Sequence, residues 1–202
     1  MPTPNRSFST SLILCSTSFF LGMIFVNWTY DHGTLWMTAP APEAFASSKQ
    51  HYAMLASEPP VIRNAFHFVV GLGLLGFVIK LYKPSESNKL FDGGSLVLYM
   101  AGLIIYLTNL HNGFQSVLSG EWGDVDEATG INVIAASQVI IALTLMGVLG
   151  LQVGQYWAEV QDAAEEEQYK QEQRLHRERR RHAHKGEHAS TTEDDGEEKK
   201  DK

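Results

Sequence analysis

Cysteine is nearly absent from this chain of 202 residues, with Cys15 as its single example. A disulfide within the chain, a zinc site built from paired cysteines and a dithiol redox centre are therefore excluded. The same absence excludes the four-helix membrane proteins that carry out thiol redox chemistry.

Charge is scarce in the first part of the chain and dense in the last. Up to residue 157 the sequence has 15 charged residues (6 Lys or Arg and 9 Asp or Glu), whereas residues 158–202 have 24 (10 and 14). The formal net charge of -7 thus sums two unlike parts of the chain and says little about binding partners. No nucleic-acid partner is expected. We predict a membrane domain over residues 1–157 and a charged cytosolic tail over residues 158–202.

The part of the chain that is poor in charge, residues 1–157, contains long apolar runs. The strongest, residues 133–151, has no charged residue and only Ser137, Gln138 and Thr144 as polar members. Its length matches the roughly 20 residues that a helix needs to cross the hydrocarbon layer. Three more runs of this kind predict an all-α membrane protein with four transmembrane helices. The predicted spans are Phe8–Trp28, Val61–Leu81, Ser95–Phe114 and Ile131–Val153.

The first run has a cleaved signal peptide as its alternative interpretation. The segment Phe25–Tyr30, through which the run ends, lacks a small-x-small cleavage site, so an uncleaved anchor is favoured. Asn27-Trp28-Thr29 is a glycosylation sequon close to the membrane, and the sequence leaves open whether it is modified.

Polar segments connect the runs. We predict a proline-broken first loop, Asp31–Glu58, with a short helix at Glu43–Leu55. A tight second loop, Tyr82–Gly94, and an acidic third loop, Gln115–Gly130, complete the set.

Lysine and arginine set the predicted orientation, because they are enriched in short cytosolic loops. Lys80, Lys83 and Lys89 lie in or beside the second loop, the third loop has no cation, and the tail is rich in arginine. The second loop, the tail and both termini are therefore expected in the cytosol.

The tail is rich in helix-forming residues over Ala158–His184 but has no apolar stripe, so a solvated helix is expected there, followed by disorder over Lys185–Lys202. Lys199 and Lys200 occupy the fourth and third places from the carboxyl end. On a cytosolic tail this pair is a candidate retrieval signal for the endoplasmic reticulum, read by a receptor as other terminal addresses are.

Groups for chemistry are missing from the spans. The predicted spans hold no Asp or Glu, and their cations, Arg63 and Lys80, lie at the two ends of the second span. Pumps and coupled transporters usually place ionisable groups at mid-membrane. No catalytic, cofactor-binding or metal-binding residues stand out, and although Asp31, His32 and His51 could form a site, no spacing recommends them. We therefore expect neither an enzyme nor a cofactor.

Polar and small residues within the spans are the remaining candidates for function. Hydrogen-bonding side chains could contact client helices or could hold this bundle together. The candidate client contacts are Asn109, Ser137, Gln138 and Thr144. The second span contains Gly71, Gly73 and Gly76, which allow close helix packing or reflect the general abundance of glycine in membrane helices. His67, near one end of the same span, is expected to have a structural role.

Two patches of the sequence are more specific than general membrane sequence. The first patch is Lys83-Pro84-Ser85-Glu86, with Lys89-Leu90-Phe91 and residues 94–99 after it. The second is residues 132–142, with Asn132, Ala135, Ala136 and Ser137 as its pattern. Both patches resemble the fungal Shr3 family of endoplasmic-reticulum membrane chaperones for amino-acid permeases. The resemblance extends over about residues 11–159 and does not include the tail in detail.

The resemblance implies a protein of the endoplasmic-reticulum membrane without catalytic activity. Such a protein prevents newly made amino-acid permeases from aggregating in the lipid bilayer and assists their packaging into transport vesicles, with vesicle coat components near its cytosolic tail. A small accessory subunit of a transporter or channel is the alternative function, and a membrane enzyme is a third hypothesis.

Overall fold

The computed structural model describes residues 4–82 and 89–197, with side chains over 8–82 and 89–179, and every element in these ranges is helical. The elements are α1 (Pro4–Leu35), α2 (Pro42–Ala56), α3 (Pro60–Tyr82), α4 (Lys89–Ile105), the π-helix η2 (Tyr106–Leu110), α5 (His111–Ser119) and α6 (Glu127–Glu197). Within the described ranges, four segments are long and apolar enough to cross a membrane: Phe8–Leu35, Pro60–Tyr82, Lys89–Ser119 and Glu127–Arg179. The prediction of an all-α membrane protein with four spans is confirmed.

The helices are longer than the predicted spans. α1 continues through Asp31, which was predicted to lie in a loop, because that side chain is buried and bonded inside the bundle. α4 begins at Lys89, within the predicted loop Tyr82–Gly94, because Asp92 is buried against Lys80. The short helix predicted inside the first loop is confirmed as α2.

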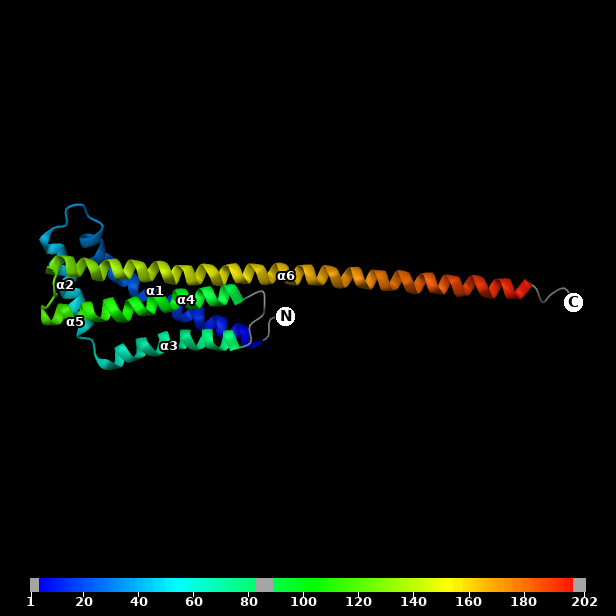
Figure 1. Cartoon of the computed structure of the whole chain (residues 1–202), viewed down its shortest axis with the longest axis horizontal. Helices are drawn as coiled ribbons and strands as arrows, with labels where there is room; N and C mark the ends of the chain where they lie inside the picture. The colour runs from blue at the N-terminus through cyan, green and yellow to red at the C-terminus, as the bar shows by residue number, and fades with distance from the viewer. Residues whose placement is uncertain (1–3, 83–88, 198–202) are drawn as a thin grey trace. The chain divides into compact units, whose positions relative to one another are not determined.

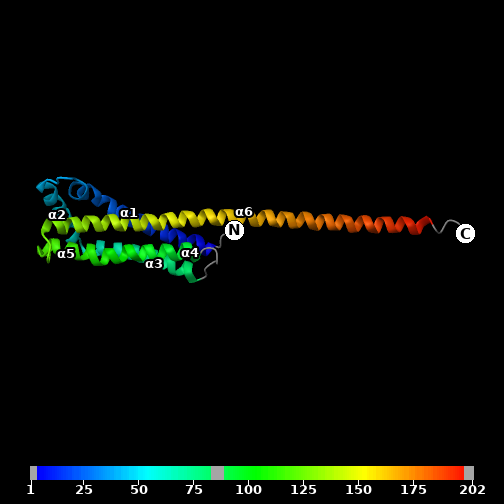
Figure 2. The same ribbon diagram turned by 45° about the horizontal axis from the view of Figure 1, so that its top comes forward.

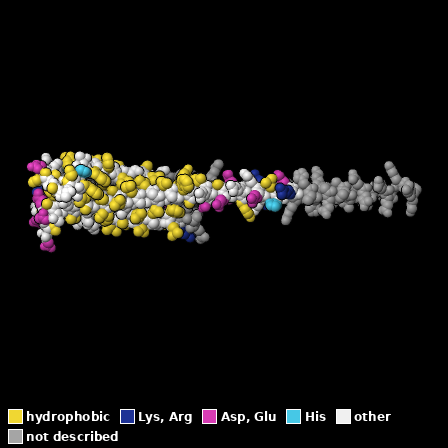
Figure 3. Space-filling model, turned by 90° about the horizontal axis from the view of Figure 1, so that it is seen from above, with side chains coloured by type: hydrophobic (Ala, Val, Ile, Leu, Met, Phe, Trp, Pro, Cys, Tyr) yellow, Lys and Arg dark blue, Asp and Glu magenta, His cyan; other side chains and the backbone are white. Residues whose placement is uncertain are grey.

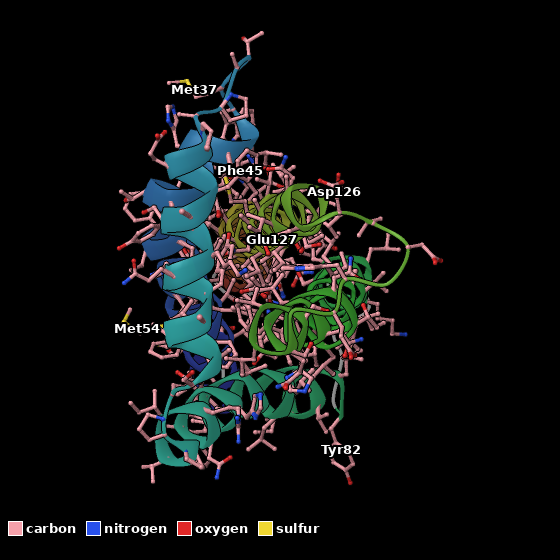
Figure 4. All side chains as sticks on the ribbon, turned by 90° about the vertical axis from the view of Figure 1, so that its left-hand side faces the viewer. Met37, Phe45, Met54, Tyr82, Asp126 and Glu127 are labelled. Carbon is pink, nitrogen blue, oxygen red and sulfur yellow. The ribbon has the colours of Figure 1, made fainter. Side chains whose placement is uncertain are left out.

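Within Met1–Gln155, the four spanning segments lie side by side (Figure 1). The beginning of α1, the end of α3 and the beginning of α4 meet at one end; α2, the end of α5 and the beginning of α6 meet at the other, which we call the α2 end (Figure 1 and Figure 2). α2 lies along one side of the α2 end, in front of α1 and beside α5 and α6, with Phe45 directed toward these helices and Met54 away (Figure 4).

Glycine allows two pairs of spans to approach closely. A Cβ atom added at Gly73 would lie 2.5 Å from the Tyr99 hydroxyl oxygen and 2.6 Å from Ser16 Oγ, and one at Gly76 would lie 2.9 Å from the Ser9 carbonyl oxygen. A Cβ atom at Gly71 would meet nothing within 4 Å. Two of the three candidate glycines of the second span therefore serve packing, which replaces the hydrophobic effect as the force between helices in lipid.

The core has two parts. Between the spans, large side chains with almost no exposure pack together, among them Phe20, Phe77, Tyr99 and Leu145. Beneath α2 a second cluster forms around Tyr52, Val117, Ile131 and Ile134. α2 is thus packed against the bundle as a part of it.

Residues beyond the bundle form a second compact unit. The chain divides into Met1–Gln155 and Tyr156–Lys202. Helix α6 continues to Glu197, so over residues 185–197 the structure differs from the predicted disorder, and no proline interrupts this stretch. Residues 198–202 of that prediction lie outside the described residues. The described side chains from Val160 to Arg179 are exposed, as expected of a solvated helix. The membrane-domain boundary at residue 157 stays a prediction.

Candidate functional site

Asn27 and Asp31 of α1 face the same side of the helix at the α2 end, because residues four apart are neighbours on a helix surface. α2 turns Ser48, His51 and Tyr52 toward the bundle by the same spacing, and all of these side chains are buried. Helix α6 supplies Gln138, which is 1% exposed. Three helices thus bring polar groups into one buried cluster, which we call the cap network.

Hydrogen bonds join every helix of the cap network. Asn27 Nδ2 donates to Gln138 Oε1 at 2.6 Å, and His51 Nε2 lies 2.8 Å from Asn27 Oδ1. The Tyr52 hydroxyl donates to Asp31 Oδ1 and accepts from Gln138 Nε2 at 3.1 Å. A buried polar group is costly unless it is bonded, so these bonds fix where α2 sits on the spans.

Burial sets the protonation states on α2. It raises the pKa of Tyr52, and the nearby Asp31 carboxylate raises it further, so the phenol stays protonated and can donate. Burial lowers the pKa of His51, which keeps the imidazole neutral. The ring of His51 also stacks on Tyr30, with centroids 3.8 Å apart.

A second cluster, the lysine network, lies at the opposite end of the bundle. Lys80 Nζ is 2.8 Å from Asp92 Oδ1, 2.7 Å from Gln152 Oε1 and 2.6 Å from Gln155 Oε1. Gln152 Nε2 in turn donates to Ser95 Oγ at 2.9 Å. All five side chains are at most 7% exposed. The network joins α3, α4 and α6.

A third set of bonds holds the middle of the bundle. Ser16 Oγ donates to the Val69 carbonyl oxygen at 2.7 Å and lies 2.9 Å from the Tyr99 hydroxyl. Tyr99 donates to the Val70 carbonyl oxygen at 2.9 Å. These bonds pass over Gly73, which explains why that position has no room for a side chain.

The four candidate client contacts have partners within the chain. Gln138 is buried in the cap network, and Ser137 Oγ donates to the Val133 carbonyl oxygen at 2.7 Å. Thr144 Oγ1 donates to the Ile141 carbonyl oxygen, and Asn109, although exposed, donates to Ser137 Oγ at 3.1 Å. Gln138 and Asn109 bond to other helices of the bundle, whereas the bond of Thr144 lies within α6. A client contact by these residues stays a prediction, with exposed Asn109 as its most accessible member.

The family-motif residues divide between described and masked positions. Lys83, Pro84, Ser85 and Glu86 lie outside the described residues. On α6, Ala135 and Ser137 are buried, and Asn132 and Ala136 are half-buried. The described part of the motif thus belongs to helix packing beneath α2. The candidate retrieval pair, Lys199 and Lys200, also lies outside the described residues.

His67, for which the sequence indicated a structural role, has a hydrogen-bond partner on another helix. Its Nε2 atom is 3.1 Å from the Tyr106 hydroxyl, on the π-helix that interrupts the third span. Within that π-helix Thr108 Oγ1 donates to the Ile104 carbonyl oxygen at 2.8 Å, which competes with the helical backbone bond there.

The sequon at Asn27 is closed to modification in this fold. The side chain is 7% exposed and both of its polar atoms are bonded, to Gln138 and His51. Glycosylation attaches a bulky sugar at the surface, so this asparagine is unsuited to it.

The outward surface of the bundle is predominantly apolar, and acidic side chains gather at the α2 end (Figure 3). Large exposed hydrophobic residues occur on all four spanning segments. They include Phe25 on α1, Phe68 on α3, Val97 on α4 and Leu143 on α6. With the described polar clusters turned inward, the surface that a neighbouring membrane protein meets is this apolar one.

Sequence reasoning missed the two networks but had a pattern that could have found them. Asn27 and Asp31 are four residues apart, and Gln152 and Gln155 are three apart, so each pair shares a helix face. Polar residues that recur on one face of an otherwise apolar helix indicate partners inside the protein. Asp31 and His51 belong to the same network, in which Asn27, Gln138 and Tyr52 link them.

Comparisons with known proteins agree on one group. The sequence profile of a family described as "ER membrane protein SH3", the SHR3 chaperone family, matches residues 5–193. The secretory component protein psh3 of Schizosaccharomyces pombe is 26% identical over 158 residues, which cover 78% of this chain and 73% of that protein. No solved structure matches the chain.

Proposed function

The chain belongs to the SHR3 chaperone family of endoplasmic-reticulum membrane proteins, and from that premise we propose that its clients are newly made amino-acid permeases. The chain is a multi-pass membrane chaperone of the endoplasmic reticulum. In the proposed function it prevents permeases from aggregating before they fold, and it assists their packaging into transport vesicles. It does so by binding, without catalysis.

The observation that carries the proposal is the division between inside and outside of the bundle. The described polar clusters bond to one another within the bundle, and the spans present large apolar side chains outward. A partly inserted permease exposes helix faces that lack their final neighbours, and unpaired polar groups are expensive in lipid. A rigid apolar bundle can lie against such faces by van der Waals packing and leave when the client's own helices arrive.

The proposed orientation places both termini in the cytosol. The acidic residues Glu121, Asp124 and Asp126 lie between α5 and α6, at the α2 end, and lysines lie around the connection at the opposite end. Because lysine and arginine favour the cytosolic side, the α2 end faces the lumen. The tail then lies in the cytosol, where coat components could meet it and where the pair Lys199 and Lys200 could act in retrieval.

Deleting the gene tests the proposal against its alternative. We expect amino-acid permeases to accumulate in the endoplasmic reticulum while unrelated plasma-membrane proteins reach the surface. If permeases reach the surface normally and a single transport current disappears instead, the chain is an accessory subunit of that transporter. Turnover by the purified protein that depends on Asp31 or His51 would instead indicate an enzyme.

A further inference from the structure

A crevice of about 140 Å³ enters the side of the bundle near the α2 end. Aromatic rings form much of its wall: Phe20 from α1, Phe66 from α3, Tyr106 from η2 and Phe114 from α5. Three of these rings contact one another: the Phe20 and Phe66 centroids are 5.2 Å apart at an interplanar angle of 79°, and the Tyr106 centroid is 5.8 Å from that of Phe20 and 5.2 Å from that of Phe66. The wall is therefore fixed by ring packing and is suited to a hydrocarbon chain.

The crevice opens on the outer surface of the bundle. Three of its lining side chains are large, apolar and exposed: Met23 and Val26 on α1, and Ile62 in the first turn of α3. In a membrane protein such residues face lipid, so a lipid chain can enter the crevice from the bilayer without crossing water.

Two opposite charges line the same crevice. Glu58 lies between α2 and α3, and Arg63 lies in the first turn of α3. Both side chains are half-buried, and within the described part of the chain neither has an ion-pair or side-chain hydrogen-bond partner. Their place at the beginning of a span puts them at the level of the lipid headgroups.

We propose that the crevice binds one zwitterionic phospholipid. Part of one acyl chain lies along the aromatic wall, the phosphate meets Arg63 and the ammonium group meets Glu58. Partly desolvated charges without partners are costly, and a headgroup that carries both signs removes both costs. An anionic phospholipid offers nothing to Glu58 and is repelled by it, and a sterol offers one hydroxyl group to two charges.

Photolabelling of the full-length protein tests the proposal. The purified chain is placed in nanodiscs that contain a phosphatidylethanolamine, whose ammonium group carries N–H donors, with a diazirine on one acyl chain, and adducts are mapped by peptide mass spectrometry. We expect adducts on the α1 and η2–α5 walls of the crevice. Because a hydrogen bond to a charged group is worth about tenfold in affinity, Arg63→Gln and Glu58→Gln should each reduce this labelling by about tenfold.

Matched variants separate the site from a loss of folding. Arg63→Lys keeps the charge and should keep most of the labelling, whereas Ala56→Phe should abolish it by filling the crevice without altering a charge. Lys49→Gln and Glu127→Gln break an exposed ion pair of 2.6 Å between α2 and α6 outside the crevice, and should leave the labelling unchanged. The proposal is overturned if the glutamine variants label like the parent protein. It is equally overturned if a phosphatidylglycerol probe labels the same walls as strongly. Both outcomes concern lipid binding alone, so they are independent of whether amino-acid permeases are the clients.

Discussion

Removing the charge of Lys80 should lower the free energy of unfolding of the bundle more than the removal of a surface charge does. The Lys80 ammonium group donates to Gln152 Oε1 at 2.7 Å and to Gln155 Oε1 at 2.6 Å, and it forms an ion pair with Asp92 Oδ1 at 2.8 Å. In Lys80→Met the Asp92 carboxylate, on a residue only 2% exposed, is left without its counter-charge.

The size of the expected loss in unfolding free energy follows from the burial of Lys80 and Asp92. Breaking a buried ion pair by removing one partner costs about 3–5 kcal/mol, because the other charge stays buried and uncompensated. Replacing both partners by apolar residues of similar size is often close to neutral. We therefore expect Lys80→Met and Asp92→Leu to cost about 3 kcal/mol or more each, and the double variant to cost less than either.

The assay is unfolding by sodium dodecyl sulfate in mixed micelles, followed by the fluorescence of the four tryptophans. Glu166→Gln serves as the control, since it breaks an exposed ion pair with Lys170 in the tail unit and should leave bundle unfolding unchanged. Additive costs in the double variant would refute the reasoning, because they would mean that the two charges do not stabilise each other.

Three further predictions concern single residues. Tyr52→Phe should destabilise the protein by about 1–3 kcal/mol in the same assay, because it leaves buried partners of the cap network without a bond; an unchanged midpoint would contradict the network. Gly73→Ala should cost about 1–3 kcal/mol by overpacking, whereas Gly71→Ala, whose Cβ atom meets nothing, should be nearly neutral; equal effects would refute the packing role. Endoglycosidase treatment should not shift the gel mobility of the protein, and Thr29→Ala should leave that mobility unchanged; a shift lost in Thr29→Ala would show that Asn27 is glycosylated and accessible.

The sequence was sufficient for the spans because their determinant is local. A run of about 20 apolar residues is stable in lipid only as a helix, whatever surrounds it. The ends of the helices were predicted less well, because they depend on partners distant in the chain. Asp92 belongs to a helix since Lys80 lies beside it, and Asp31 does so since Tyr52 bonds to it.

The candidate site was harder to predict for the same reason. Gln138 was identified as a polar residue in a span, but its partners on α1 and α2 are 111 and 86 residues away. A single sequence contains no information on which distant face it meets. The crevice could not be predicted at all, since its walls come from α1, α2, α3, η2 and α5.

Site-specific photocrosslinking tests the central claim most directly. A photoreactive residue is placed at Leu143, which is 63% exposed on α6, or at Val97, 68% exposed on α4, with the fully buried neighbour Leu145 as the control. Membranes that synthesise an amino-acid permease truncated after half of its spans should yield adducts from the two exposed positions and none from Leu145. These adducts should disappear once the permease is complete. Adducts that persist with the mature permease, or none at all from either exposed position, would contradict the account.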